Sequence, residues 1–484
     1  MTESHDDRHW EQEPLPILSP SPTYRSSADG RLVSYSRPCA DVQATAFLAQ
    51  GAGRERFFWE DVRDDITFAG FGVAVHLMAW GPKRVEHIEE QARALFADAA
   101  LLNELTTLEA PILAAPRLFG GFAFRADFSP DYAWSAFHPA HFVLPHYQYV
   151  RASEGAWLTI NAMLSAEDDV RQALPELREA LDARYAQLRD AASQANDQEA
   201  GWGRHGRPQQ MRYPLPYETW AAQIEAAQEQ FATTPLRKVV LSRVAELRFG
   251  QPVDVDGALH YLNEQYQESY RFLFEPQPHH AFFGATPELL AKVEGDTISS
   301  MAMAGSIGRS SDGREDEALG QQLLNSAKDR YEHNVVVMSM LERLAPLTAQ
   351  LEISPQPGVY KLRNIQHLFT PIRGRLLQPQ GILPLVNLLH PTPALGGAPR
   401  SMALEFIRQM EPVTRGWYAA PVGWIDYRLD GAFAVAIRSA VSQHRRVWLY
   451  AGSGIVADSE PQKEWDETAL KFQPMLEALG AVDP

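Results

Sequence analysis

The order of strands and helices constrains the fold of this chain more than any other feature of its sequence. Apolar runs rich in β-branched and aromatic residues follow one another, separated by short Gly, Pro or Asp segments. Strict alternation with helices would indicate a parallel sheet, whereas runs of strands are typical of antiparallel sheets. The sequence therefore predicts an α+β fold with large antiparallel sheets and connecting helices.

A polar segment at 197–216 divides the expected elements. It contains Gly201, Gly203, Gly206 and several prolines, so it is the best candidate for a linker. The predicted regions are a disordered tail at 1–25, an N-terminal α+β region at 26–210 and a second region at 211–484. Helices are expected at 83–103, 166–198, 217–231, 315–344 and 401–410, and a turn is expected at 286–290.

Composition limits the classes of protein that the chain can belong to. It has 484 residues and is 45% hydrophobic, which allows a sizeable core. Its formal net charge of −17 argues against nucleic acid and anionic membranes, because both require a basic surface. The single cysteine, Cys39, excludes an intramolecular disulfide, and no apolar run approaches the roughly 18 residues of a membrane span. We expect a cytoplasmic monomer without nucleic-acid or membrane partners.

Residues 452–471 combine two features that suit an anionic ligand. Gly452, Ser453 and Gly454 follow an apolar run and are expected to form a turn whose amides can approach an anion. Glu464, Glu467 and Lys471 then share one helical face, because their spacing is i, i+3 and i+7. This face is either a solvated helix surface or a site whose carboxylates hold a hard cation beside a substrate carboxylate.

A second acidic pair bears on the same choice. Asp329 and Glu332 also lie one turn apart on an expected helix. If the two helices face each other, their four acids would repel strongly without a cation, and Mg²⁺ takes carboxylate oxygens as ligands. The alternative is two separate solvated faces.

Three further positions carry chemistry that depends on burial. Lys238 begins an apolar strand, so its amine either reaches the surface or, if buried, can act as a base. Glu288 follows Thr-Pro and is either a turn acid or a functional one. Arg438 ends an apolar strand and needs a carboxylate partner from the protein or from a ligand.

The motifs together resemble the chorismate-utilising enzymes, and within them the isochorismate synthases. The matching stretches, in the family's order, are KVVLSR from residue 238, FFGATPELL from 282, AMAGS from 302, KDRYEH from 328, IQHL from 365, LHPTPALGGAPR from 389, GWYAAPVGWID from 416, FAVAIRSA from 433 and YAGSGIVADSEPQKEWDETALK from 450. They cover roughly residues 215–480. The FFWED and PRLFGGFAF stretches, from 57 and 116, also resemble this subgroup.

The resemblance implies a fold and a reaction. The fold is two stacked antiparallel sheets with helices outside and a central cleft that holds the site, so the two regions would be intertwined. In the reaction, chorismate binds with Mg²⁺, water adds at C2, the double bonds shift and the C4 hydroxyl leaves, giving isochorismate. The product would serve menaquinone or siderophore synthesis, and the FFWED stretch favours menaquinone.

The resemblance also implies residue roles. Lys238 matches the base that activates water, and Glu288 matches the acid that protonates the leaving hydroxyl. Glu332 and Glu467 match metal ligands, with Asp329 and Glu464 beside them as ligands or through water. The expected substrate contacts are Gly305, Ser306, His367, Tyr418, Arg438, Gly452, Ser453, Gly454 and Lys471.

Two alternatives stay open within this family. A salicylate synthase would keep the lysine and the glutamate and then eliminate pyruvate, but Ser306 and Ala394 stand where such enzymes usually carry threonine. A non-catalytic member of the fold is disfavoured, since Lys238, Glu288 and the acids are all present. Ala304 stands where aminodeoxychorismate synthases carry a nucleophilic lysine, which excludes that covalent chemistry.

Overall fold

The computed structural model describes residues 30–103, 112–165, 167–194 and 206–482. The predicted tail at 1–25 and part of the predicted linker lie outside these ranges. Among the described residues, every strand pairing is antiparallel except a short parallel one between β1 (Arg31–Pro38) and β4 (Ala100–Asn103). The predicted α+β class with large antiparallel sheets is confirmed.

The sheet branches at one long strand, β6 (Ala140–Ala152). Its first residues pair with β5 (Arg117–Phe122), its last residues pair with β7 (Gly155–Leu164), and β3 (Ile66–Ala79) runs along most of its length. Two series of strands therefore leave β6, one through β3 and the other through β5. We call them the first arm and the second arm.

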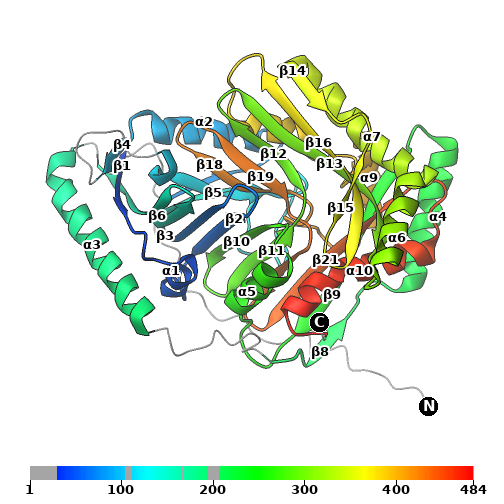
Figure 1. Ribbon diagram of the computed structural model, residues 1–484, viewed down its shortest axis with the longest axis horizontal. Coiled ribbons are helices and arrows are strands. Elements are labelled where there is room, and N and C mark those ends of the chain that lie inside the picture. Colours follow the sequence, from blue (N-terminus) through cyan, green and yellow to red (C-terminus); the bar gives the residue numbers. More distant parts are fainter. Residues whose placement is uncertain (1–29, 104–111, 166, 195–205, 483–484) are drawn as a thin grey trace.

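Each arm continues through strands that are distant in sequence (Figure 1). Beyond β3, the first arm contains, in order, β2 (Arg56–Asp61), β10 (Tyr270–Gln277), β11 (His280–Thr286), β20 (Ser439–Gln443), β21 (Arg446–Ile455) and β9 (Lys238–Arg248), which also pairs with β8 (Gln210–Arg212) and β17 (Gly397–Ala398). Beyond β5, the second arm contains β18 (Pro421–Asp426), β19 (Gly431–Val435), β12 (Leu289–Glu294), β13 (Thr297–Gly308) and β16 (Ile365–Leu376), which also pairs with β14 (Thr348–Ile353) and β15 (Gly358–Lys361).

Pairing crosses the predicted boundary at residue 210 in both arms. β2 pairs with β10 in the first arm, and β5 pairs with β18 in the second. The short strand β8, at the end of the predicted linker, adds to the edge of β9. The division into two regions remains a prediction, but both regions contribute strands to each arm.

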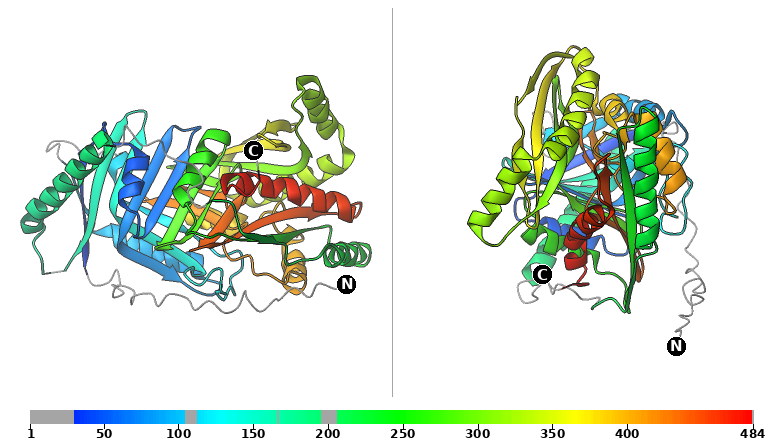
Figure 2. Two further views of the ribbon diagram at one scale, coloured as in Figure 1. Left: turned by 90° about the horizontal axis from the view of Figure 1, so that it is seen from below. Right: turned by 90° about the vertical axis from the view of Figure 1, so that its right-hand side faces the viewer.

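Helices pack on the outside of the arms (Figure 2). They are α1 (Ala44–Gln50), α2 (Arg84–Ala97), α3 (Val170–Gln194), α4 (Tyr217–Thr233), α5 (Val255–Gln265), α6 (Gly313–Asn325), α7 (Ala327–Leu344), α8 (Ile382–Leu389), α9 (Arg400–Met410) and α10 (Pro461–Ala478), with short 3₁₀ turns at η3 (Ile112–Ala114) and η5 (Ala345–Leu347). No helix among the described residues is long and apolar enough to cross a bilayer.

Three expected boundaries differ from the structure. The helix expected at 83–103 ends at Ala97, and its last residues form β4. The helix expected at 315–344 is two helices, because the hydroxyl of Ser326 accepts the Asp329 amide and caps a new helix, α7. The turn expected at 286–290 is shorter, since β12 already begins at Leu289.

An aromatic cluster joins the N-terminal strands to the second half of the chain. Trp134 is fully buried and donates its indole N–H to the hydroxyl of Tyr450 at 2.9 Å. Trp417 donates to the carbonyl of His138 at 2.9 Å and packs against Phe137. Satisfied indole donors within an apolar core fix the position of β21 and of the segment after α9.

Candidate active site

A pocket lies between the two arms, with an open volume of about 70 Å³. β9 and β21 of the first arm face it from one side, and β13 and β16 of the second arm face it from the other. Its lining contains many of the predicted site residues: Glu288, Gly305, Ser306, Glu332, His367, Tyr418, Arg438, Gly452, Gly454, Glu467 and Lys471. Lys238, Asp329, Ser453 and Glu464 do not line this pocket, although Lys238 pairs with Glu332, which does.

Lys238 is buried at the start of β9. Its side chain is 1% exposed, and its amine forms an ion pair with Glu332 at 2.8 Å. Of the two alternatives for this lysine, the structure therefore has the buried one. Gly454 makes room for the pair, because a Cβ there would lie 2.4 Å from a Glu332 oxygen and 3.0 Å from Lys238 Cε.

Glu288 lies in the short connection between β11 and β12. It is 4% exposed, and burial raises the pKa of its carboxyl to about 8, against the opposing charges of Lys238, Lys471 and Arg438. The carboxyl is therefore protonated at neutral pH and can donate a proton. This is the state that the predicted acid needs.

The two acidic helices meet, and their acids are not on solvated faces. Lys328 of α7 reaches Glu464 of α10 at 3.0 Å, and Glu464 is 2% exposed. The hydroxyl of Ser453 donates to the other oxygen of Glu464 at 2.5 Å. Asp329 accepts a bond from the hydroxyl of Ser326 and lies against Gly305.

The two helical acids that line the pocket, Glu332 and Glu467, each pair with a lysine. Glu467 pairs with Lys471 and accepts from the Ser306 hydroxyl at 3.0 Å. Burial raises the pKa of Glu467, but the charge of Lys471 and the hydrogen bonds from Lys471 and Ser306 have a larger combined effect. The pKa of Glu467 is therefore lowered. Burial raises the pKa of Asp329, and the charges of Glu332 and Glu467 add to that rise. The carboxylates are therefore close enough to act on one another.

Arg438 ends the apolar run after β19 and has no carboxylate partner within ion-pair distance among the described residues. Its nearest polar contact is the ring of His367, 3.4 Å from the guanidinium, and burial lowers the pKa of Arg438 to about 10. Burial and the charge of Arg438 lower the pKa of His367 to about 3, so the imidazole is neutral. A buried guanidinium that faces a neutral ring and no carboxylate can bind the carboxylate of a ligand.

Gly452, Ser453 and Gly454 are part of β21 and do not form the predicted turn. They pair with Ser242, Leu241 and Val240 of β9. The Val240 amide donates to Gly396 and the Ser242 amide to Glu411, both away from β21. In an antiparallel ladder, the amides of Gly454 and Gly452 opposite them must also point away from β9, toward the pocket.

Gly305 shapes the floor of the pocket. It is a bulge in the pairing of β13 with β16, has φ +75°, and a Cβ there would lie 3.0 Å from that of Asp329. The bulge turns its carbonyl toward His367 Nδ1, 3.3 Å away. Glycine is needed here for both its backbone conformation and its small size.

Comparison with known proteins identifies the family. A model of the family described as chorismate binding enzyme matches residues 20–480. The chain belongs to the chorismate-binding enzymes. The predicted resemblance is therefore confirmed.

Several relatives of this chorismate-binding enzyme are isochorismate synthases. It is 36% identical to isochorismate synthase MenF of Bacillus subtilis, over 93% of each chain. It is 37% identical to the salicylate biosynthesis isochorismate synthase of Pseudomonas aeruginosa, over 88% of this chain and 85% of that one. The menaquinone-specific isochorismate synthase structure from Escherichia coli superimposes with a TM-score of 0.73 at 25% identity, covering 93% of this chain and 95% of that one.

Among the residues that line the pocket, Arg415 and Tyr450 are polar and were not predicted as site residues. Arg415 is 4% exposed, pairs with Glu411 and donates to the carbonyls of Leu395 and Val240 at 3.0 and 2.7 Å. Tyr450 stacks on Tyr418 with ring centroids 5.1 Å apart. Two features of the sequence could have indicated them. Arg415 stands directly before the GWYAAP stretch, and the alternation of side chains along a strand places Tyr450 on the same side as Gly452.

The acids of this chorismate-binding enzyme have the oxygen donors that suit a hard cation. Among the described residues, no three His, Cys, Asp or Glu side chains are gathered closely enough to hold a metal ion. Each acid instead forms an ion pair with a lysine or accepts a hydrogen bond from a serine. The donor chemistry fits magnesium, and its binding would require Glu332 and Glu467 to exchange these partners.

Proposed function

We propose that this chorismate-binding enzyme is an isochorismate synthase, an isomerase that moves the hydroxyl of chorismate from C4 to C2. The observation that supports it most is Glu288, a buried carboxyl that keeps its proton at neutral pH, in the same pocket as Glu332, the ion-pair partner of Lys238. Adding water at one carbon and losing hydroxide from another requires both a base and an acid.

The side chains would move protons as follows. Lys238 takes a proton from the water that attacks C2, the ring double bonds shift, and Glu288 gives its proton to the hydroxyl that leaves C4. One water enters and one leaves, so the net reaction is an isomerisation. Lys238 then returns its proton, and Glu288 regains one, before the next turnover.

Carboxylate recognition would use the other side of the pocket. Arg438 has a free guanidinium edge beside neutral His367, and the Gly452 and Gly454 amides point off the edge of β21. These donors suit the enolpyruvyl carboxylate, with Tyr418 beside them.

Magnesium would be held by Glu332 and Glu467, with Asp329 and Glu464 behind them. When bound, it neutralises the ring carboxylate and the acids. Glu332 would then turn from Lys238 to the cation and release the lysine amine for its role as the base.

The test is an assay of the purified chain with chorismate and Mg²⁺, with the products separated by chromatography. Isochorismate without pyruvate is the expected result. Salicylate with pyruvate would replace the proposal by a salicylate synthase, and unchanged chorismate would indicate a non-catalytic member of the fold. The similar proteins include one named for salicylate biosynthesis and one described as menaquinone-specific, so neighbouring enzymes would decide where the product goes.

A further inference from the structure

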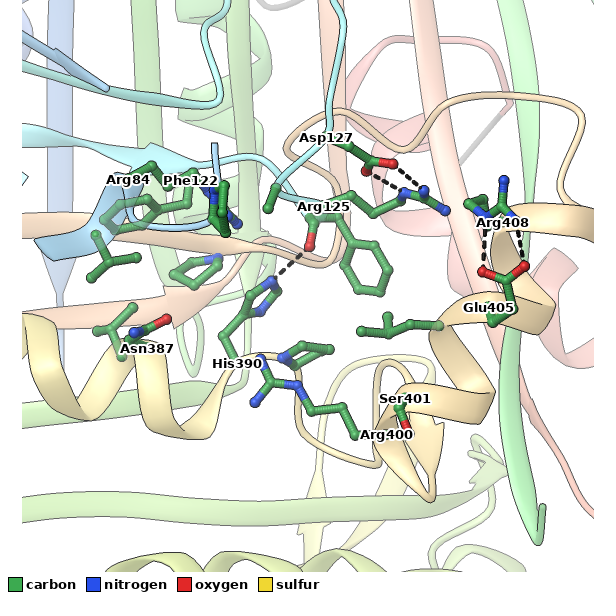
Figure 3. Close-up of a pocket in the computed structure, with 18 residues that line it drawn as sticks. Arg84, Phe122, Arg125, Asp127, Asn387, His390, Arg400, Ser401, Glu405 and Arg408 are labelled. Atoms are coloured by element: carbon green, nitrogen blue, oxygen red, sulfur yellow. Dashed lines mark hydrogen bonds and ion pairs between the residues drawn. The ribbon is translucent and has the colours of Figure 1, made fainter. Parts of the chain in front are cut away.

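A second cavity, separate from the active-site pocket, has a volume of about 370 Å³ (Figure 3). It lies where the beginning of α2, the residues after β5 and the connection from α8 to α9 meet. None of its lining residues also lines the pocket between the arms. We call it the arginine cavity, after Arg84, Arg125, Arg400 and Arg408 in its wall.

The acids in the wall of the arginine cavity neutralise only two of its four arginines. The two carboxylate oxygens of Asp127 accept hydrogen bonds from two nitrogens of the Arg125 guanidinium. The carboxylate of Glu405 does the same for Arg408, as the dashed lines in Figure 3 show. Among the described residues, Arg84 and Arg400 have no carboxylate within ion-pair distance. The cavity therefore carries excess positive charge in a chain whose formal net charge is −17.

Arg84 is buried without enough partners. It is 7% exposed, one terminal nitrogen donates to the Ala123 carbonyl at 3.1 Å, and its buried Nε has no hydrogen-bond partner. Burial lowers the pKa of Arg84 to about 10. A buried guanidinium with an unused donor costs free energy that an anion would offset.

Arg400 faces the same cavity from the first residue of α9. Its one hydrogen bond is long, 3.5 Å to the Leu388 carbonyl. Burial, and then the charges of Arg343 and Arg84, lower the pKa of Arg400 to about 10. The two free arginines therefore repel each other, and an anion between them would relieve that repulsion.

The rest of the wall indicates what kind of anion fits. Its apolar part is formed by Val85, Phe122, Phe124, Val386, Leu404 and Pro421. An inorganic anion would satisfy the arginines but leave this apolar surface without contacts. We propose that the arginine cavity binds a small organic carboxylate with an apolar ring, the carboxylate on Arg84 and Arg400 and the ring against the phenylalanines.

The experiment is calorimetric titration of the full-length protein with sodium benzoate and, separately, with neutral benzamide. Benzoate should bind saturably and benzamide at least about tenfold more weakly, because benzamide cannot form the charge-assisted hydrogen bonds to the arginines. Arg400→Gln should weaken benzoate binding by about tenfold or more. Arg375→Gln, a 70% exposed arginine on β16, is the matched control and should bind as the wild type does.

A variant of the active-site arginine shows whether benzoate binds in the arginine cavity or in the active-site pocket. Arg438→Ala should leave the benzoate affinity unchanged if the arginine cavity is the site. Loss of binding in Arg438→Ala but not in Arg400→Gln would overturn the proposal, as would equal binding of benzamide or no binding of benzoate. Because Arg400 also contacts α8, Arg400→Lys provides a second test: it keeps the charge without the guanidinium fork and should bind with intermediate affinity.

Discussion

At the scale of single residues, the site depends on two buried groups with opposite needs. Glu288 must keep a proton, and burial accomplishes this without a hydrogen-bonding acid beside it. Lys238 must be able to lose one, yet it is paired with Glu332. In this structure Glu288 can donate a proton, whereas activation of water requires Lys238 to exchange its partner Glu332.

Glu288 should make stability fall as pH rises. The pKa of its carboxyl is about 8 in the folded chain and about 4.5 ordinarily, so the folded state retains a proton that the unfolded state loses between these values. Unfolding free energy should therefore decrease by roughly 1.4 kcal/mol per pH unit through most of this window. Glu288→Gln removes the slope and also the activity.

Urea unfolding of both proteins at several pH values between about 5 and 8 measures this effect. The control is Glu294→Gln, an exposed glutamate at the end of β12, which should retain the wild-type slope. Parallel stability curves for wild type and Glu288→Gln would show that the carboxyl is not protonated in the folded chain.

Lys238→Ala should reduce turnover of chorismate by about 10²–10⁴-fold, the usual contribution of a general base. The protein should still fold, because the space left is lined by Glu332, which water can reach. Steady-state rates, with circular dichroism to check the fold, measure it. Lys463→Ala, at an exposed position on α10, should leave the rate unchanged; full activity in Lys238→Ala would remove it as the base.

The sequence predicted the residue types of the site better than their surroundings. Lys238, Glu288, Arg438 and the pocket glutamates could be predicted from motifs that occur in family order. Arg415 could not be predicted in this way, because it contacts backbone carbonyls and an aromatic ring that only the fold brings together. Gly452 was expected in a turn, since a glycine-rich segment gives the same signal in a turn and in a strand that needs space.

At the scale of elements, two helices of opposite arms bring the acids together. α7 packs on β13 of the second arm and α10 on β21 of the first. The Lys328–Glu464 pair bridges them. The sequence showed both acidic faces, but their distance depends on how the arms curve, which no local pattern encodes. The break at Ser326 was missed because both halves have helical periodicity.

Ser326 should stabilise the beginning of α7 as its helix cap. Its hydroxyl accepts the Asp329 amide and also bonds the Asp329 carboxylate beside Gly305. Ser326→Ala should lower the unfolding free energy by about 1 kcal/mol, and Ser326→Thr should restore most of it. Urea unfolding measures both variants. Equal stability of all three proteins would contradict the capping role.

Glu467→Gln should weaken magnesium binding. The amide loses the charge that would hold the cation, so the magnesium concentration for half-maximal rate should rise by about tenfold or more. Calorimetric titration with MgCl₂ gives a reading that does not depend on turnover. Asp466→Asn, an exposed acid on the same helix, is the control. An unchanged magnesium titration in Glu467→Gln would exclude it as a ligand.

At the scale of the whole molecule, the two arms make one structural unit. β6 starts both arms, and each arm begins with strands from before residue 210 and continues with strands from after it. The α+β class could be predicted because strands in series leave little alternative to antiparallel pairing. The branch at β6 could not be predicted, because it depends on pairings such as β5 with β18, whose residues lie about 300 positions apart in the sequence.

The fragment 206–484 should therefore not fold alone. Without β2 and β5, the edges of β10 and β18 are unpaired and apolar. The full chain should show one calorimetric unfolding transition, whereas the fragment should show none. A chain that begins at residue 30 is the control and should unfold as the full chain does. A cooperative transition in the isolated fragment would show that the two regions are independent.

The branched sheet also sets an order of events during synthesis. β2 and β5 leave the ribosome early, but their partners β10 and β18 are made some 200 and 300 residues later. Until then, two apolar strand edges have nothing to pair with, and the pocket cannot form. Folding must therefore wait until nearly the whole chain has been translated, and this enzyme should depend on chaperones more than a protein whose sheets assemble from neighbouring strands.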